Sequence, residues 1–182
     1  MEFLRRVFSL VAFLLGLVFA LAPLPAAPPS PNEYALKSVF LYNFCRFIDW
    51  PDSAFSSRRD PLIIGVVGED PFGPLLEEAI AGETYHGREI EVAHFRDAQQ
   101  IGECHLLFVG QTNTELYDQI LAAVVGRHVV TVGETDNFLD HGGMIALTAE
   151  QNRVRLRINS AALRATRLNV SSKLLQVADI RL

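Results

Sequence analysis

Leu62-Ile63-Ile64-Gly65-Val66-Val67-Gly68 is the stretch that decides the fold, because an unbroken apolar run closes at a glycine. A strand that is apolar at every position is buried on both faces, as in a parallel sheet that helices cover on two sides. Further strands, separated by segments of helical periodicity, are marked by Ile90, Val92 and Phe95, by Leu106–Val109 and by Val129–Val132. This alternation predicts an α/β fold for the centre of the chain.

Caps and helix breakers predict where the helices lie. Three segments combine such signals with an apolar stripe: from the capping box Ser30-Pro31-Asn32-Glu33 to Trp50-Pro51, from Asp70-Pro71 to Gly82, and from Leu116 to Gly126. Each ends at a glycine or before a proline, which are the residues that stop helices. The second and third segments lie between predicted strands and can serve as crossovers in a parallel sheet.

The last third of the chain changes character. Met144–Leu147 and Val154–Ile158 flank a polar stretch, which predicts a hairpin. Asn159 and Ser171 can each cap a short helix. We therefore predict one domain over residues 30–182, with a mostly parallel central sheet, helices on both faces and an antiparallel C-terminal hairpin at one edge.

The first residues have the order of a secretory signal peptide. Arg5 and Arg6 precede an apolar run from Val7 to Ala22, and small residues and prolines follow. The run is shorter than the ~20 residues that span a bilayer as a helix. We predict a signal peptide over residues 1–26, cleaved between positions 22 and 27, so that no segment stays in the membrane; an uncleaved anchor is the alternative. The formal net charge of −5 argues against nucleic-acid binding.

Catalytic and metal-binding motifs with specific spacing are missing from the sequence. The five histidines are scattered, and there is no CxxC pair, no GxSxG elbow and no SxxK motif. At Cys104-His105, a buried and hydrogen-bonded histidine is favoured over a thiol–histidine nucleophile, because an exported chain meets oxidising conditions. We expect no catalytic residue, no metal site and no cofactor.

Two glycine-containing segments can serve either a turn or a ligand. Gly68–Gly73 follows a strand, where open α/β sheets bind ligands, but it lacks the spaced glycines or the lysine of a phosphate loop. Glu69 and Asp70 would also repel a phosphate. Gly142-Gly143 permits a positive φ or the close approach of another segment. We interpret the first segment as a turn and cap and the second as a tight turn.

Six short segments follow one another in a recognisable order. They are Tyr42-Asn43-Phe44 with Phe47–Pro51, Gly68–Phe72, Cys104–Phe108, Phe138 with Gly142–Ile145, Ile158-Asn159, and Ser171–Leu175. In this order they resemble the YfiR-like family of periplasmic regulators, over nearly all of the chain after the leader. The resemblance implies a non-enzymatic periplasmic protein that restrains an inner-membrane diguanylate cyclase, or another membrane sensor, by binding its periplasmic sensory region. Cyclic di-GMP and biofilm formation would then be controlled from outside the inner membrane.

One departure from the family concerns the cysteines. Family members often have a cysteine in the first strand, two residues before the glycine of the Gly-x-Asp-Pro-Phe turn, where this chain has Val66. Cys104 therefore lacks that usual partner. Cys45 lies in the first predicted helix, and a bond would require its Cα within ~7 Å of the Cα of Cys104. We predict that the two are not paired with each other.

Strand ends and caps gather at one edge of such a sheet, so this edge supplies the candidate contacts with a partner or ligand. These are Phe72, His105, Asn159 and Lys173, with turn and cap roles as the alternative. Two other functions stay open: a ligand-binding module that serves another membrane sensor or an uptake system, and an exported α/β hydrolase that brings together Asp70, His105 and Asp136. A homodimer also stays open.

Overall fold

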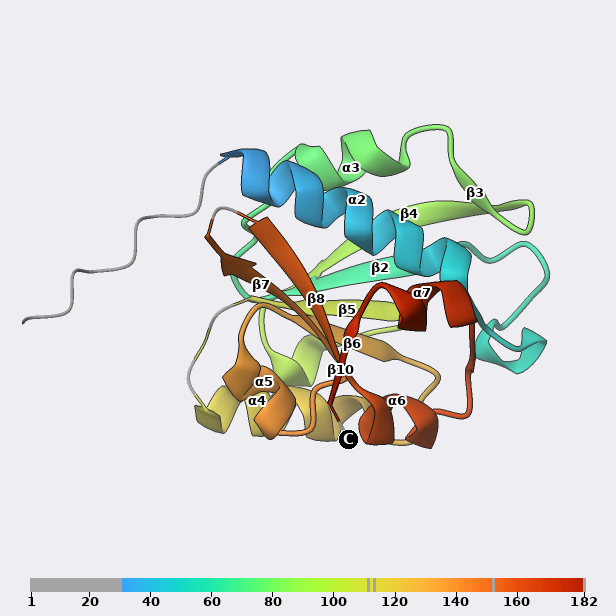
Figure 1. Ribbon diagram of the computed structural model, residues 1–182. Coiled ribbons are helices and arrows are strands. Elements are labelled where there is room, and N and C mark those ends of the chain that lie inside the picture. The colour runs from blue at the N-terminus through green and yellow to red at the C-terminus, as the bar shows by residue number, and fades with distance from the viewer. Residues whose placement is uncertain (1–30, 111, 113, 152, 182) are drawn as a thin grey trace, which may run out of the picture.

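The structure is a computed structural model that describes residues 31–110, 112, 114–151 and 153–181 (Figure 1). The predicted signal peptide and Ser30 of the predicted capping box lie outside the described residues. The helices are α2 (Pro31–Phe47), α3 (Leu75–Ile80), α4 (Thr114–Val124), α5 (Asp136–Asp140), α6 (Ser160–Ala165) and α7 (Ser172–Gln176), with 3-10 turns η2 (Asp52–Ala54) and η3 (Ala98–Gln100). The strands are β1 (Ile48–Asp49), β2 (Leu62–Val67), β3 (Thr84–Tyr85), β4 (Arg88–Phe95), β5 (Leu106–Val109), β6 (Val130–Gly133), β7 (Ile145–Glu150), β8 (Arg153–Asn159), β9 (Asn169–Val170) and β10 (Asp179–Arg181).

The main sheet has the order β10-β8-β7-β6-β5-β2-β4-β3. Strands β4, β2, β5, β6 and β7 are mutually parallel, and β7 and β8 form the antiparallel hairpin. The prediction of a mostly parallel sheet with helices on both faces and a C-terminal hairpin is confirmed. Two strands extend it: β10 pairs in parallel with β8 at one edge of the sheet, and β3 pairs antiparallel with β4 at the other.

The central strands are buried on both faces, as their uniform apolar composition requires. Along β5, Leu106 and Phe108 pack into the core beneath α2 and α3, whereas Leu107 and Val109 pack with α4 and α5 on the other face. Side chains alternate across a strand, so each face of the sheet needs its own helical cover. Figure 1 shows these two helical layers above and below the sheet.

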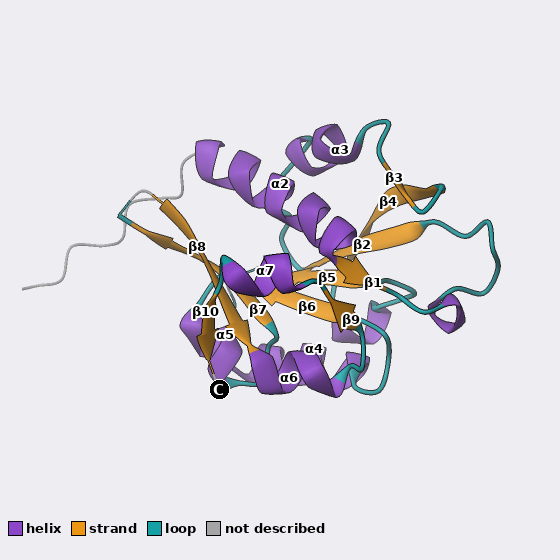
Figure 2. Cartoon of the chain, turned by 45° about the vertical axis from the view of Figure 1, so that its right-hand side comes forward, coloured by secondary structure: helices purple, strands orange, loops and turns teal. Residues whose placement is uncertain are grey.

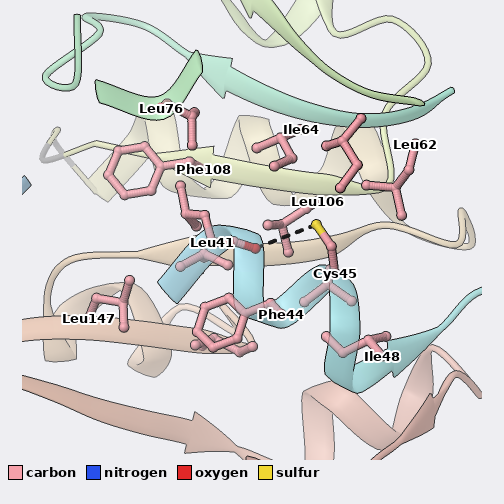
Figure 3. Close-up of a cluster of buried hydrophobic side chains, with 14 of the residues drawn as sticks. Leu41, Phe44, Cys45, Ile48, Leu62, Ile64, Leu76, Leu106, Phe108 and Leu147 are labelled. Atoms are coloured by element: carbon pink, nitrogen blue, oxygen red, sulfur yellow. Dashed lines mark hydrogen bonds between the residues drawn. The ribbon is translucent and has the colours of Figure 1, made fainter. Parts of the chain in front are cut away.

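Helix α2 covers one face of the sheet. Its Leu41, Phe44 and Cys45 are fully buried, as is Ile48 in the adjoining β1, and they share a core cluster with Leu106 of β5 (Figure 3). A spacing of three and four residues places Leu41, Phe44 and Cys45 on one face of the helix. The helix is described from Pro31 onward and ends at Phe47, three residues before Trp50. Burying this face fixes α2 across the parallel strands.

Short pairings that are distant in sequence complete the fold. Strand β1 pairs with β9 in a separate antiparallel sheet, and the Ser171 N–H donates to the Phe47 carbonyl at 2.8 Å. Figure 2 shows this pair beside α7. The contacts tie the end of α2 to the C-terminal segment.

Gly142 and Gly143, which precede β7, each have a structural role that requires a glycine. Gly142 has a φ of +95°, which is the left-handed region that glycine tolerates. At Gly143, an added Cβ would lie 2.3 Å from the ring of Phe138, which is fully buried. The first glycine makes the turn, and the second admits an aromatic side chain of α5.

Candidate functional site

The candidate site is a cavity of about 580 Å³ at the carboxyl ends of three parallel strands. Gly68 follows β2, Gly110 follows β5, and Glu134 follows β6, and all three line it. Counted along the chain, the five parallel strands have the order 2-1-3-4-5, so the order reverses between β2 and β5. Open α/β sheets bind ligands outside the carboxyl ends of the strands at such a reversal.

A buried ion network closes one side of this cavity. Lys37 is 1% exposed on α2, and its side chain forms an ion pair with Glu134 and lies 2.6 Å from the Glu33 carboxylate, one turn earlier. The side chain of Glu134 is 2% exposed. A charge at this depth is tolerated when an opposite charge satisfies it. The network therefore fixes the start of α2 over the end of β6.

Tyr34 links the ion network to the cavity. The Lys37 ammonium lies 4.8 Å from the centroid of its ring, and Phe72 packs against the ring edge-on at 5.6 Å. Burial raises the pKa of Tyr34 well above its usual range, and the carboxylates of Glu134, Glu33 and Glu69 raise it further. The phenol is therefore neutral, and it can donate a hydrogen bond at the site.

The remaining walls are apolar inside and charged at the rim. The apolar lining comes from β2, β5, α4 and the loop after β2: Val67, Pro71, Val109, Leu116 and Ile120. The charged lining includes Glu69, Arg96 and Asp97. Apolar walls with a few polar groups at the rim are suited to binding a small molecule.

Phe72, the first candidate contact from the sequence, anchors the loop beside this cavity. Asp70 Oδ1 accepts a hydrogen bond from the Phe72 N–H at 2.9 Å, and the Phe72 ring lies 4.7 Å from that of Phe108. Phe72 is 2% exposed, so its role in this structure is packing. The helix predicted to start at Asp70-Pro71 begins at Leu75, because Asp70 forms a local turn first.

His105, the second candidate contact, lies at the opposite end of the strands. Its Nδ1 accepts from the Ile63 N–H at 3.0 Å, its Nε2 lies 3.1 Å from the Ala54 carbonyl, and its ring stacks on Phe55 at 4.3 Å. Burial lowers the pKa of His105 below its ordinary value of 6.5. Both bonds suit a neutral imidazole with its proton on Nε2. The interpretation as a buried, hydrogen-bonded histidine is confirmed.

Asn159 and Lys173 occupy two different helix starts. Asn159 caps α6, where its Oδ1 accepts from the Ala162 N–H at 3.0 Å and its Nδ2 donates to the Leu139 carbonyl at 3.3 Å. Lys173 is exposed on α7. Among the four candidates, only Lys173 is exposed and neither packs in the core nor caps a helix in the described residues.

The expectation that these candidates share one edge is wrong. Phe72 follows the carboxyl end of β2, whereas the His105 N–H donates to the carbonyl of Ile63 near the amino end of that strand. Four residues of strand, about 13 Å, separate the two levels. Turn and cap signals occur at both ends of parallel strands, so they do not define an edge. Whether any candidate contacts a partner stays a prediction.

The hypothetical hydrolase site does not assemble. Asp70 and Asp136 follow the carboxyl ends of β2 and β6, and His105 lies at the amino ends. Asp136 forms an ion pair with Arg157, and Asp70 Oδ2 lies 3.3 Å from the ring of His94. No charge relay can form across the length of the strands.

The two cysteines lie in different cores. Cys45 belongs to the cluster beneath α2, where its Sγ lies 3.5 Å from the Leu41 carbonyl, and Cys104 belongs to the cluster of α4 and α5. Both are free thiols, and the sheet separates them. Burial raises the pKa of Cys45 to about 12 and that of Cys104 to about 11. Neither thiol is poised for thiolate chemistry.

The fold and the cavity define a class: a small doubly wound α/β protein with a cleft at the strand reversal. Residues 34–179 match the family model described as YfiR/HmsC-like. The match covers most of the chain, and the chain belongs to this family. At the level of the family, its members are periplasmic regulators of diguanylate cyclase signalling. None of the helices in the described part has the length and apolar character that crossing a bilayer requires.

Two solved structures are similar to this chain. A crystal structure of a conserved domain protein from Vibrio cholerae O1 biovar El Tor str. N16961 has a TM-score of 0.55 and 12% identity, covering 81% of this chain and 59% of that one. The ABC domain from Streptococcus pneumoniae in complex with L-Trp has a TM-score of 0.49 and 12% identity, covering 66% and 55%. The chain thus spans less than two thirds of either protein, and the first likeness shows the fold alone. Among curated proteins, none matches the chain.

Proposed function

We propose that this chain is a non-enzymatic periplasmic regulator that binds the periplasmic sensory region of an inner-membrane diguanylate cyclase and restrains it. Membership of the YfiR/HmsC-like family carries this proposal. The cyclase makes cyclic di-GMP on the cytosolic side, so the regulator acts by contact and never meets the nucleotide. Release of the contact raises cyclic di-GMP and favours biofilm formation.

The surface we assign to the partner lies around α7 and β10. Three apolar side chains are exposed there, Leu175 at 37%, Val177 at 71% and Ile180 at 42%; we call them the C-terminal patch. Lys173 and Asp179 flank the patch and are exposed. Exposed apolar side chains with charged neighbours are typical of protein-binding sites. This assignment keeps Lys173 as a partner contact.

The patch can supply the energy that a regulatory contact needs. Fully burying a valine or isoleucine side chain contributes roughly 1.5–3 kcal/mol. Two or three such side chains at the centre of an interface have the size of binding hot spots. Because β10 is the outer strand of the sheet, its free edge offers backbone groups next to the same side chains. A signal then acts by changing the relative affinity of the regulator for the restrained and released states of the cyclase.

A matched pair of variants tests this surface. Val177→Asp places a charge in the patch, and Val125→Asp makes the same change after α4, at a residue that is 79% exposed. Tagged protein is used to recover partners from solubilised inner membranes, with the bound cyclase identified by mass spectrometry. We expect Val177→Asp to lower recovery at least tenfold, and Val125→Asp to leave it unchanged at an equal melting temperature. Failure of the unmodified protein to recover any diguanylate cyclase contradicts the proposal.

A second candidate function is a periplasmic ligand-binding module that serves another membrane sensor or an uptake system. The cavity at the carboxyl ends of β2, β5 and β6 favours it, because its volume lies in the range of small-molecule sites. Recovery of a transporter or a different sensor in the same experiment would support this alternative over the first.

A further inference from the structure

The cavity beside Tyr34 carries more negative than positive charge. Four carboxylates lie in or next to it, on Glu33, Glu69, Asp97 and Glu134. Two cations oppose them, on Lys37 and Arg96. The excess is two negative charges in a partly enclosed space with apolar walls, where water screens them less than at an open surface.

The charges differ in how far they are already satisfied. Glu134 and Glu33 share Lys37, and Asp97 accepts hydrogen bonds from the backbone of η3. Glu69 and Arg96 are both exposed at the rim, and neither side chain takes part in a hydrogen bond or salt bridge with a described residue. The carboxylate of Glu69 is therefore the anionic group at the rim that can meet a ligand.

The raised pKa of Tyr34 agrees with an excess of negative charge in the cavity. The pKa of its hydroxyl is raised by burial first, then by Glu134, Glu33 and Glu69. All three charges act in the same direction. A phenol at the wall of the cavity therefore senses a negative potential from both the buried and the rim carboxylates.

The walls beyond the rim are hydrocarbon. Val67 and Val109 come from the strand ends, and Leu116 and Ile120 stand one turn apart on α4. No group of three metal-binding side chains occurs among the described residues, so the carboxylates do not converge on a metal ion. The charge excess disfavours an anion. An organic ligand with a positive end and an apolar body suits both the charge excess and the apolar walls.

We propose that this cavity binds a small organic monocation, such as a primary alkylammonium. The ammonium group faces the carboxylate of Glu69 at the rim, and the hydrocarbon body lies against Val109 and Leu116. This inference goes beyond the regulatory role and does not depend on it. A regulator with this site would sense amphiphilic amines in its surroundings.

Three probes of equal chain length separate charge from apolar burial: n-hexylamine, which is protonated at pH 7, n-hexanol and hexanoate. The protein is expressed from the full coding chain and labelled with ¹³C at methyl groups, and each probe is titrated by NMR. We expect n-hexylamine to shift the methyl resonances of Val109, Leu116 and Ile120, and to bind about fivefold or more tightly than n-hexanol, in line with one partly exposed charge pair. Hexanoate should bind more weakly than n-hexanol.

Charge reversal at the rim gives the decisive comparison. Glu69→Lys should weaken n-hexylamine binding about fivefold or more, whereas Glu77→Lys, at an exposed residue of α3 outside the cavity lining, should change it less than twofold. Both residues are exposed, so both variants should fold. Equal affinity for the three probes, tighter binding of hexanoate, or no shift of the three methyl resonances overturns the proposal. None of these results bears on the pull-down of the cyclase.

Discussion

Replacing Lys37 by methionine is predicted to lower the free energy of unfolding by about 4 kcal/mol. Lys37 is 1% exposed and the side chain of Glu134 is 2% exposed, so the substitution leaves a carboxylate buried without its counter-ion. Breaking a buried pair from one side costs about 3–5 kcal/mol. Glu33 is 16% exposed at its side chain and can be hydrated, so it adds little. The cost therefore comes from Glu134.

Urea unfolding followed by the fluorescence of Trp50, the single tryptophan, measures this loss. With a denaturant slope of about 2 kcal/mol per molar urea, the midpoint should fall by about 2 M. The double variant Lys37→Met/Glu134→Met removes both charges and should return to within about 1 kcal/mol of the unmodified protein. A midpoint shift below about 0.5 M for the single variant, or equal instability of the two variants, refutes the account of this network.

Three further predictions concern the interior. Gly143→Ala should lower the free energy of unfolding in urea by about 2 kcal/mol or more, because its Cβ would lie 2.3 Å from the ring of Phe138. Gly102→Ala, whose Cβ would have its nearest contact at 3.4 Å, should lower it by under about 1 kcal/mol. Equal losses in the two variants contradict this prediction. Burial lowers the pKa of His105, so the folded state prefers the neutral imidazole, and this contribution to stability is complete above pH 6.5 and is lost as the pH falls below it. The free energy of unfolding should therefore fall less between pH 7.5 and pH 5 in His105→Gln than in the unmodified protein. An equal fall in the two proteins argues against this role of His105. Both cysteines should react with a thiol reagent at pH 8 only after unfolding, and labelling of the native protein within minutes would show that burial does not protect them.

Uniformly buried strands were the most predictable part of the fold. Leu106–Val109 was predicted as a strand and has those bounds in the structure. Its four side chains meet helices on both faces, so the sequence there contains nothing but apolar residues. The hairpin of β7 and β8 was also predictable, because Leu156 and Ile158 alternate with polar neighbours.

The short helices α6 and α7 were predictable from their caps Asn159 and Ser171, but three other short elements were not. Strands β1 and β9 have two residues each and form because Ile48 pairs with Val170 far along the chain. Helix α5 has five residues and depends on a cap by Thr135, whose side chain accepts from the Phe138 N–H. Tertiary contacts decide these three elements, and local propensity over so few residues is too weak to reveal them.

The cavity and its ion network were missed for a related reason. Lys37 and Glu134 are 97 positions apart, and no spacing rule connects them. One signal was present, because Lys37 falls on the same face of α2 as Leu41 and Phe44, and a lysine among buried positions requires a counter-ion. The sequence could not say which carboxylate supplies it. The candidate contacts were assigned to one edge of the sheet because they lie in caps and turns, but caps and turns occur at both ends of the strands.

The most direct test of the central claim is the cellular level of cyclic di-GMP, measured by mass spectrometry. Deletion of the gene should raise it severalfold, and the unmodified chain should restore it. Complementation with Val177→Asp should fail, whereas Val125→Asp should succeed, at equal protein levels. Unchanged cyclic di-GMP in the deletion strain would contradict the account.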